Sequence, residues 1–304
     1  MLRKYPRELV KLIYNPTSGR SDAEPTLLQN IIRGLQTLHF TPEVYLTQPG
    51  DDLKSIILDA LHRKIHLFIV CGGDGTIEAV ASHLIGKRAN LGIIPAGTQN
   101  NVALSLGVLN ETTKALELLR NGRRSKIDIG IAKSEHSEVY FLEVCSAGLY
   151  SALFQSADNL QKGNLSSIGE LLTTLTAFPL AKIDMLLENK QQVNLEGHVA
   201  LIANLPYFGL NYRVTPDGSF DNGLLDVMVF SEFSKLELVG NMLQTTGEEA
   251  GNHRIRRYRV KTVEINTVPA MPVQADGTAL GNTPVIINVK QKALSVITGM
   301  PARA

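Results

Sequence analysis

The chain has 304 residues, of which 44% are hydrophobic and 19% charged, and its formal net charge is +1. This length predicts about two domains, and the composition is that of an ordinary globular protein. The near-zero net charge creates no overall field that would attract nucleic acid, so we expect no nucleic-acid partner. No apolar stretch reaches the roughly 18 residues that a membrane-spanning helix needs, and the charged N-terminus lacks the apolar core of a secretory signal. We therefore expect a cytoplasmic protein that is at most peripheral to a membrane.

The first 124 residues alternate between strand-like and helix-like segments. Strands are predicted at 9–14, 40–46, 67–71 and 91–94, and helices at 24–38, from 51 onward, at about 77–86, at 101–106 and at 111–120. Alternation of this kind packs helices on both faces of a mainly parallel sheet. We therefore expect an N-terminal α/β nucleotide-binding domain over residues 1–124.

The pattern changes near residue 124, where short strand-like runs separated by Gly, Asn, Asp and Pro turns begin. Such runs predict an antiparallel β-sandwich, which we place at residues 125–295. Helical patterns interrupt it at roughly 149–178 and at 235–246. The tail, 296–304, is a candidate for packing back on the first domain. The predicted fold class is thus α/β, with an N-terminal α/β domain and a C-terminal β-sandwich that takes the substrate.

The stretch HLFIVCGGDGT at 66–76 places an apolar strand directly before a glycine-rich turn and a helical segment. This order brings main-chain N–H groups close to a phosphate, and the glycines leave no Cβ between chain and ligand. The stretch is neither a Walker loop nor the GxGxxG dinucleotide fingerprint. Asp74 would repel a polyphosphate unless a divalent cation or an inward hydrogen bond accommodates the carboxylate.

Four loops follow the predicted parallel strands, at 15–20, 47–50, 72–76 and 97–101, and all are rich in Gly, Ser, Thr or Asn. In open α/β sheets, ligands bind at the edge where such loops lie. Any single loop is equally well explained as an ordinary turn. The four together favour a nucleotide site.

Two acidic turns stand out in the second half. The turn at 217–226 carries closely spaced oxygen ligands that suit Mg²⁺ or Ca²⁺, although a hairpin with Asn222-Gly223 at its tip explains the same spacing. In the turn at 274–278, Asp276 is a candidate general base, but an ordinary turn is the simpler interpretation. The basic run at 253–261 is either an attractor of anionic headgroups or an edge strand protected by charge.

With these motifs in place, the chain resembles the diacylglycerol-kinase catalytic-domain family, which includes bacterial lipid kinases and sphingosine and ceramide kinases. The similarity runs in order through IYNPTSGR, CGGDGT, IPAGTQNNVA, KIDIG, CSAG, ALIANLPYFG, DNGLLDVMVF and QADG. The resemblance implies a nucleotide domain and a β-sandwich with ATP and Mg²⁺ between them. It also implies a lipid hydroxyl, at the membrane surface, as the phosphoryl acceptor.

The resemblance also assigns residues by matched position. The nucleotide contacts would be Asn15, Pro16, Thr17, Ser18, Gly19, Thr47, Gly72, Gly73, Asp74, Gly75, Thr76, Gly97 and Thr98. Asp276 matches the family's proposed general base, and the metal-binding turn would use Ser219, Asn222 and Leu224. Three positions depart from the family pattern: Glu78-Ala79 stands for the usual Asn-Glu, Asn222 for an Asp, and Thr278 for a Glu.

The leading hypothesis is an ATP-dependent lipid kinase of phospholipid metabolism that phosphorylates a hydroxyl of a diacylglycerol-like lipid. A relative of NAD kinase or phosphofructokinase, with a soluble acceptor, is the alternative enzyme, because both use GGDG-type loops. The alternative from another functional class is a protein that binds a nucleotide or a lipid with weak or no catalysis. Asn222 and Thr278, which replace the acidic residues of the family pattern, suggest it. The lipid and the oligomeric state, a homodimer included, stay open at this point.

Overall fold

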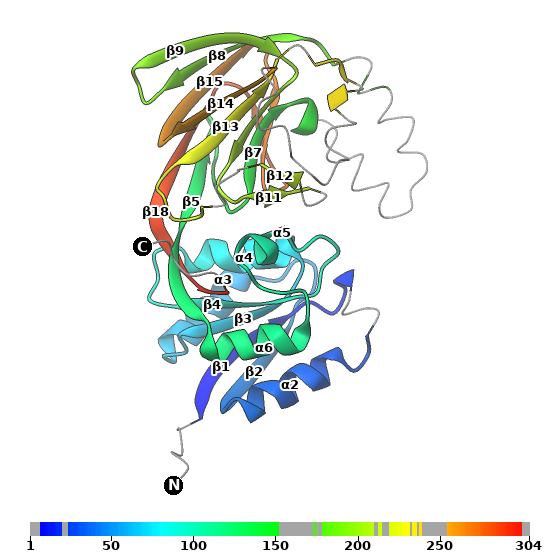
Figure 1. Ribbon diagram of the computed structural model, residues 1–304. Coiled ribbons are helices and arrows are strands. Elements are labelled where there is room, and N and C mark those ends of the chain that lie inside the picture. Colours follow the sequence, from blue (N-terminus) through cyan, green and yellow to red (C-terminus); the bar gives the residue numbers. More distant parts are fainter. Residues whose placement is uncertain are drawn as a thin grey trace. The chain divides into compact units, whose positions relative to one another are not determined.

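The computed structural model describes residues 7–19, 24–151, 173, 175, 178–209, 212–214, 219–231, 233–235, 237–238 and 254–299 (Figure 1). The chain divides into two units. Unit 1 comprises Met1–Ile127 with Lys292–Ala304, and unit 2 comprises Asp128–Gln291. Most of the two helical segments predicted at 149–178 and 235–246 lies outside the described residues.

Unit 1 is built on a parallel sheet. Its strands are β1 (Glu8–Tyr14), β2 (Phe40–Leu46), β3 (Leu67–Gly72) and β4 (Asn90–Pro95), in the order β2-β1-β3-β4. The end of β18 (Val285–Thr298) joins them, with Ser295 and Val296 paired in parallel with the start of β4. A strand from the far end of the chain therefore completes the N-terminal sheet, which is parallel as predicted.

Helices cover both faces of this sheet. They are α2 (Leu27–Thr37), α3 (Leu53–His62), α4 (Asp74–Leu84), α5 (Asn101–Ser105) and α6 (Thr112–Asn121). Figure 1 shows α2 and α6 on one face and α3 and α4 on the other, and Gly34 of α2 lies directly against Leu116 of α6. Because both faces are covered, every residue of β3 is buried, which explains its unbroken apolar sequence.

Helix α4 begins at Asp74, three residues before the predicted start at 77. Gly73 is its N-cap in an extended conformation, and its carbonyl oxygen accepts hydrogen bonds from the main-chain N–H groups of Thr76 and Ile77. The sequence prediction was wrong here because two glycines in GGDGT lower helix propensity. An acid in the first turn nevertheless suits the helix dipole. Because β3 ends at Gly72 and α4 begins at Asp74, Gly73 alone connects them.

Unit 2 is an antiparallel sandwich, as predicted. Its strands are β5 (Arg123–Lys133, beginning in unit 1), β6 (Glu138–Phe141), β7 (Val144–Gly148), β8 (Ala181–Leu187), β9 (Gln191–Gly197), β10 (Val199–Ala203), β11 (Tyr207–Phe208), β12 (Tyr212–Arg213), β13 (Leu225–Phe230), β14 (Ile255–Val260), β15 (Thr262–Val268), β16 (Pro272–Ala275) and β17 (Thr278–Asn282). One sheet has the order β14-β13-β10-β7-β16-β17, and the opposing strands follow the order β18-β15-β8-β9, with β5 beside β18 and β6 beside β5. The β8–β9 hairpin was not predicted, although Ile183, Met185 and Leu187 alternate inward along β8.

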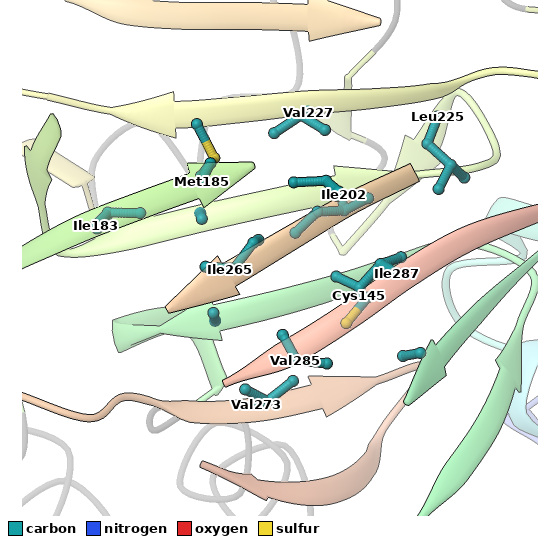
Figure 2. Close-up of a cluster of buried hydrophobic side chains, with 14 of the residues drawn as sticks. Cys145, Ile183, Met185, Ile202, Leu225, Val227, Ile265, Val273, Val285 and Ile287 are labelled. Carbon is teal, nitrogen blue, oxygen red and sulfur yellow. The ribbon is translucent and has the colours of Figure 1, made fainter. Parts of the chain in front are cut away.

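The core of unit 2 lies between the two layers of strands (Figure 2). Ile183 and Ile265 reach it from one layer, and Ile202, Val227 and Cys145 from the other. Strand β10 is buried along its whole length, because its alternate residues belong to a second apolar cluster. Both cysteines, Cys71 and Cys145, are buried, and neither forms a disulfide. Within the described ranges, no helix is long and apolar enough to cross a membrane.

Candidate functional site

The loops predicted from the sequence gather at one edge of the unit 1 sheet. Strands β1, β3 and β4 run in parallel, so their C-terminal ends lie together. Asn15 Nδ2 donates to Thr76 Oγ1 at 2.9 Å, which joins the first loop to the start of α4. Thr47 follows β2, and its N–H donates to the carbonyl of Tyr14 at 2.9 Å. A Cβ on Gly19 would lie 3.4 Å from the Oγ1 of Thr98. All four loops are therefore neighbours.

The first loop is held by its own side chains. Asn15 Oδ1 accepts hydrogen bonds from the N–H and the hydroxyl of Thr17, both at 3.0 Å. The hydroxyl of Ser18 donates to the carbonyl of Asn15 at 3.0 Å. Pro16 fixes the backbone within this Asx turn. Thr17 and Gly19 stay exposed, so a preformed loop presents them to solvent.

Glycines allow the third and fourth loops, 72–76 and 97–101, to touch. A Cβ on Gly97 would lie 2.4 Å from the Cα of Gly73, and one on Gly72 would lie 2.8 Å from the Cβ of Thr76. Gly75 is different, because a Cβ there would meet no atom within 4 Å. The close contacts require Gly72, Gly73 and Gly97, whereas a side chain at Gly75 would point into open space; we call this space beside the first turn of α4 the cradle. Gly75 lies in the first turn of α4, where helix N–H groups favour an anion.

Asp74 is accommodated by inward hydrogen bonds, one of the two arrangements considered from sequence. Its carboxylate accepts from the N–H of Asn101 at 3.1 Å and of Val102 at 3.0 Å. Burial raises the pKa of Asp74, and these main-chain hydrogen bonds oppose that shift. Asn100 closes the fourth loop, because its side chain accepts from the N–H of Gly97 and donates to its carbonyl, both at 2.9 Å. Asp74 thus fastens the glycine turn to the start of α5.

In unit 2, Asp276 lies at the tip of the β16–β17 hairpin. Ala275 pairs with Thr278, and the two residues between them have positive φ, +40° for Asp276 and +81° for Gly277. This is the two-residue turn that Asp-Gly favours. The turn interpretation of QADGT is therefore confirmed, and it does not exclude a chemical role for the carboxylate.

The carboxylate of Asp276 lies against three consecutive main-chain N–H groups. Those of Leu142, Glu143 and Val144 donate to it, the last two at 3.1 and 2.9 Å. Hydrogen bonds to a carboxylate favour its ionised form, and successive N–H groups make an anion-binding concavity. Burial is the main cause that raises the pKa of the nearby Tyr150 hydroxyl. The negative charges of Glu143 and Asp276 raise it further. The role of Asp276 as general base stays a prediction.

The turn at 219–224 is not a hairpin. Strand β13, which follows it, pairs with β10 and β14 and not with a strand just before the turn. Instead the turn docks on β5, because the N–H of Gly223 donates to Asp128 Oδ2 at 2.6 Å. A positive φ of +74° at Gly223 permits this approach. Glycine is therefore needed at position 223 for this approach to Asp128, and not because it forms the tip of a hairpin.

The donor groups of this turn are a poor match for a bound Mg²⁺ ion. Asn222 Oδ1 already accepts from the N–H of Leu224 at 2.9 Å, and the Ser219 hydroxyl lies 3.3 Å from Asp221 Oδ1, to which it donates. Magnesium prefers carboxylate oxygens, whereas Asn222 is neutral. No cluster of three or more His, Cys, Asp or Glu side chains that could hold a metal occurs in the described part of the chain. The metal assignment stays a prediction, and no step below depends on it.

Two buried residues near these turns received no role from the sequence. Asp128 is 2% exposed and Asn204 is 4% exposed. Asn204 Nδ2 donates to the carbonyls of Asp128 at 3.0 Å and Leu142 at 2.8 Å. The sequence did contain a feature that could have pointed to them. Asp128 lies within the apolar stretch IDIGI, and Asn204 directly follows the apolar stretch VALIA. A polar side chain in such a place needs buried hydrogen-bond partners.

The basic run at 253–261 includes β14, the terminal strand of its sheet. The edge-strand interpretation is therefore confirmed. Two of its cations already have acidic partners, since Arg254 lies 3.0 Å from Glu237 and Arg259 lies 2.9 Å from Asp226. These pairs reduce the charge that the strand offers to anionic headgroups.

Comparison with known proteins identifies both parts of the chain. Residues 9–132 match the family model "Diacylglycerol kinase catalytic domain", and residues 143–298 match "YegS C-terminal NAD kinase beta sandwich-like domain". The chain belongs to the diacylglycerol kinase catalytic-domain family. The predicted relationship is thereby confirmed.

Relatives of this family cover nearly the whole chain. A diacylglycerol kinase of Staphylococcus carnosus is 26% identical over 292 residues, 94% of each chain. One of Bacillus subtilis is 26% identical over 281 residues, 90% of this chain and 91% of the relative. A crystal structure of a diacylglycerol kinase from Bacillus anthracis has a TM-score of 0.75 at 22% identity, covering 96% of this chain and 97% of the other. That structure supports the fold, and the sequence relatives support a lipid kinase family.

Proposed function

We propose that this protein is an ATP-dependent kinase that transfers the γ-phosphoryl group to a hydroxyl of a diacylglycerol-like lipid. The observation that carries the proposal is the open cradle at Gly75, in the first turn of α4 and among four neighbouring loops. Membership of the diacylglycerol kinase catalytic-domain family supports the reaction class. Residues for nucleotide binding come from unit 1, and those for the lipid hydroxyl from unit 2.

Main-chain groups of unit 1 would hold the nucleotide. The four loops, 15–20, 47–50, 72–76 and 97–101, contain one Lys or Arg, Arg20, which lies outside the described residues. We therefore propose that N–H groups and the α4 dipole balance most of the phosphate charge. Gly75 leaves room for a phosphate at that helix end. Bound ATP supplies the phosphoryl group, and its accompanying Mg²⁺ neutralises charge on the phosphates.

Asp276 would act on the acceptor. A general base must begin in its ionised form, and the N–H groups of Leu142, Glu143 and Val144 favour that form. The carboxylate would take the proton of the lipid hydroxyl as the oxygen attacks the phosphoryl group. Because such a lipid lies in a bilayer, we propose that the protein works in the cytoplasm at a membrane surface.

The test is a phosphorylation assay with labelled ATP and Mg²⁺. Diacylglycerol vesicles, a total lipid extract, NAD and a sugar phosphate serve as separate acceptors. We expect label in the lipid fraction, at least tenfold above the soluble acceptors. Label in NAD or the sugar phosphate alone would replace the lipid kinase with the soluble-acceptor alternative.

A nucleotide-binding protein without transfer activity is the second candidate. The neutral Asn222, whose Oδ1 is engaged within its own turn, favours it. It predicts that ATP raises the melting temperature while no acceptor becomes labelled. Label in any lipid rejects this candidate.

A further inference from the structure

We propose that Asn204 is a positioning residue for Asp276, acting through the two peptide groups that lie between them. This inference rests on the proposed function, in which Asp276 is the general base. Asn204 directly follows β10 and is buried, and none of the sequence motifs gave it a role.

In each of these two peptide groups, the carbonyl accepts a hydrogen bond from Asn204 and the N–H donates one to Asp276. In the Leu142–Glu143 peptide, the carbonyl accepts from Asn204 Nδ2 at 2.8 Å, and the N–H donates to Asp276 Oδ1 at 3.1 Å. In the Glu143–Val144 peptide, the carbonyl accepts from the N–H of Asn204 at 2.9 Å, and the N–H donates to Asp276 Oδ1 at 2.9 Å. Each peptide group is thus held between Asn204 and Asp276.

This arrangement has two physical effects. The bonds from Asn204 fix the tilt of both peptide planes, and this tilt sets the direction in which their N–H groups point at the carboxylate. A hydrogen bond accepted by a peptide carbonyl also polarises the N–H of the same peptide and strengthens it as a donor. Asn204 therefore controls both where the Asp276 carboxylate lies and how well its charge is stabilised, without touching it.

The same side chain reaches the second acidic turn. Asn204 Nδ2 also donates to the carbonyl of Asp128 at 3.0 Å. Asp128 holds the 219–224 turn at two points, through its N–H to the carbonyl of Phe220 at 2.8 Å and through Oδ2 from the N–H of Gly223 at 2.6 Å. The two turns that the sequence singled out separately are therefore linked through one buried amide.

Burial explains why an amide is needed at this position. A side chain without N–H donors would leave two buried carbonyls, those of Asp128 and Leu142, without this partner, which is costly. Asn204 Oδ1 has no hydrogen-bond donor among the described residues. Within the side chain, Nδ2 is therefore the atom that binds the two carbonyls.

The first test is hydrogen exchange of the amides of Leu142, Glu143 and Val144 in the full-length chain, which requires no activity. In Asn204→Ala we expect the Glu143 amide to exchange about tenfold faster, because the carbonyl of its peptide group loses the side-chain donor. The Val144 amide should change less, because its peptide group keeps the bond from the main-chain N–H of residue 204. Asn282→Ala is the matched control, because it removes an exposed amide from β17, and it should leave the rates unchanged. If the alanine variant does not fold, Asn204→Ser, which keeps one donor, replaces it.

The second test separates positioning from stability. Asn204→Ala should lower kcat roughly 10- to 100-fold while KM for ATP stays at its wild-type value. In the Asp276→Asn background the same substitution should cause no further loss of kcat, because it acts through Asp276. If the losses of kcat from the two substitutions multiply, or if the Glu143 amide exchanges at its wild-type rate in Asn204→Ala, the inference is overturned. If the wild-type protein transfers phosphate to no acceptor, the proposed function fails, and the exchange rates alone decide the structural claim.

Discussion

The Gly75→Ala substitution tests the nucleotide site without disturbing the fold. Apart from the adjoining backbone of α4, no atom lies within 4 Å of the position that the new Cβ would occupy, and the residue is in the first turn of that helix. Alanine has the better helix propensity, so the free energy of unfolding should stay the same or rise by up to about 1 kcal/mol. The added methyl group would occupy the space that a bound phosphate needs.

The expected loss of affinity follows from the contact that is displaced. A hydrogen bond from an N–H to a charged phosphate contributes about 1.5–3 kcal/mol, so ATP should bind roughly ten- to a hundredfold more weakly. Isothermal titration calorimetry measures this affinity, and thermal unfolding without ligand measures stability. ATP binding of wild-type strength in Gly75→Ala would refute the placement of a phosphate at this helix end.

Two variants serve as controls for that experiment. Gly97→Ala puts a Cβ 2.4 Å from the Cα of Gly73, and it should lower the melting temperature as well as ATP binding. Ala79→Gly lies one turn further along α4 and weakens the helix by about 1 kcal/mol. If Ala79→Gly reduced ATP affinity as much as Gly75→Ala does, helix stability and not the cradle would explain the loss.

Three further predictions concern single side chains. Asp276→Asn should cut lipid phosphorylation about 10²- to 10⁴-fold with ATP binding retained, and undiminished turnover would remove the base assignment. Glu43→Gln should lower the free energy of unfolding by about 1–2 kcal/mol at pH 7 in urea titrations. The reason is that Arg63 and Lys11 hold the pKa of Glu43 at about 2. Because that pKa is depressed, the stabilisation is fully present at pH values above 4.5, the ordinary pKa, and is lost as the pH falls towards 2. The free energies of unfolding of the wild type and of Glu43→Gln, plotted against pH, should therefore converge near pH 2. Asn222→Asp should make the melting temperature respond more strongly to Mg²⁺ than that of the wild type, because a carboxylate is a better Mg²⁺ ligand than a neutral amide; an equal response of the two proteins would contradict this expectation.

The sequence by itself determined the fold class and the four loops that we propose for nucleotide binding. Periodicity carries that information locally, because apolar runs ending in Gly or Asn mark the strands of a sheet covered on both faces. The start of α4 was misplaced by three residues, since propensity alone disfavours a helix that begins inside GGDGT. The β8–β9 hairpin was overlooked, although its alternation was visible along β8.

Only the tertiary structure decided what each acidic side chain does. Asp74 turned out to hold the start of α5, and Asp276 to lie against three N–H groups that are more than 130 residues away in sequence. The role of Asn204 has the same origin, because its partners lie 62 and 76 positions away. A hydrogen bond depends on distance and direction in space, and spacing along the chain does not encode these quantities for residues so far apart.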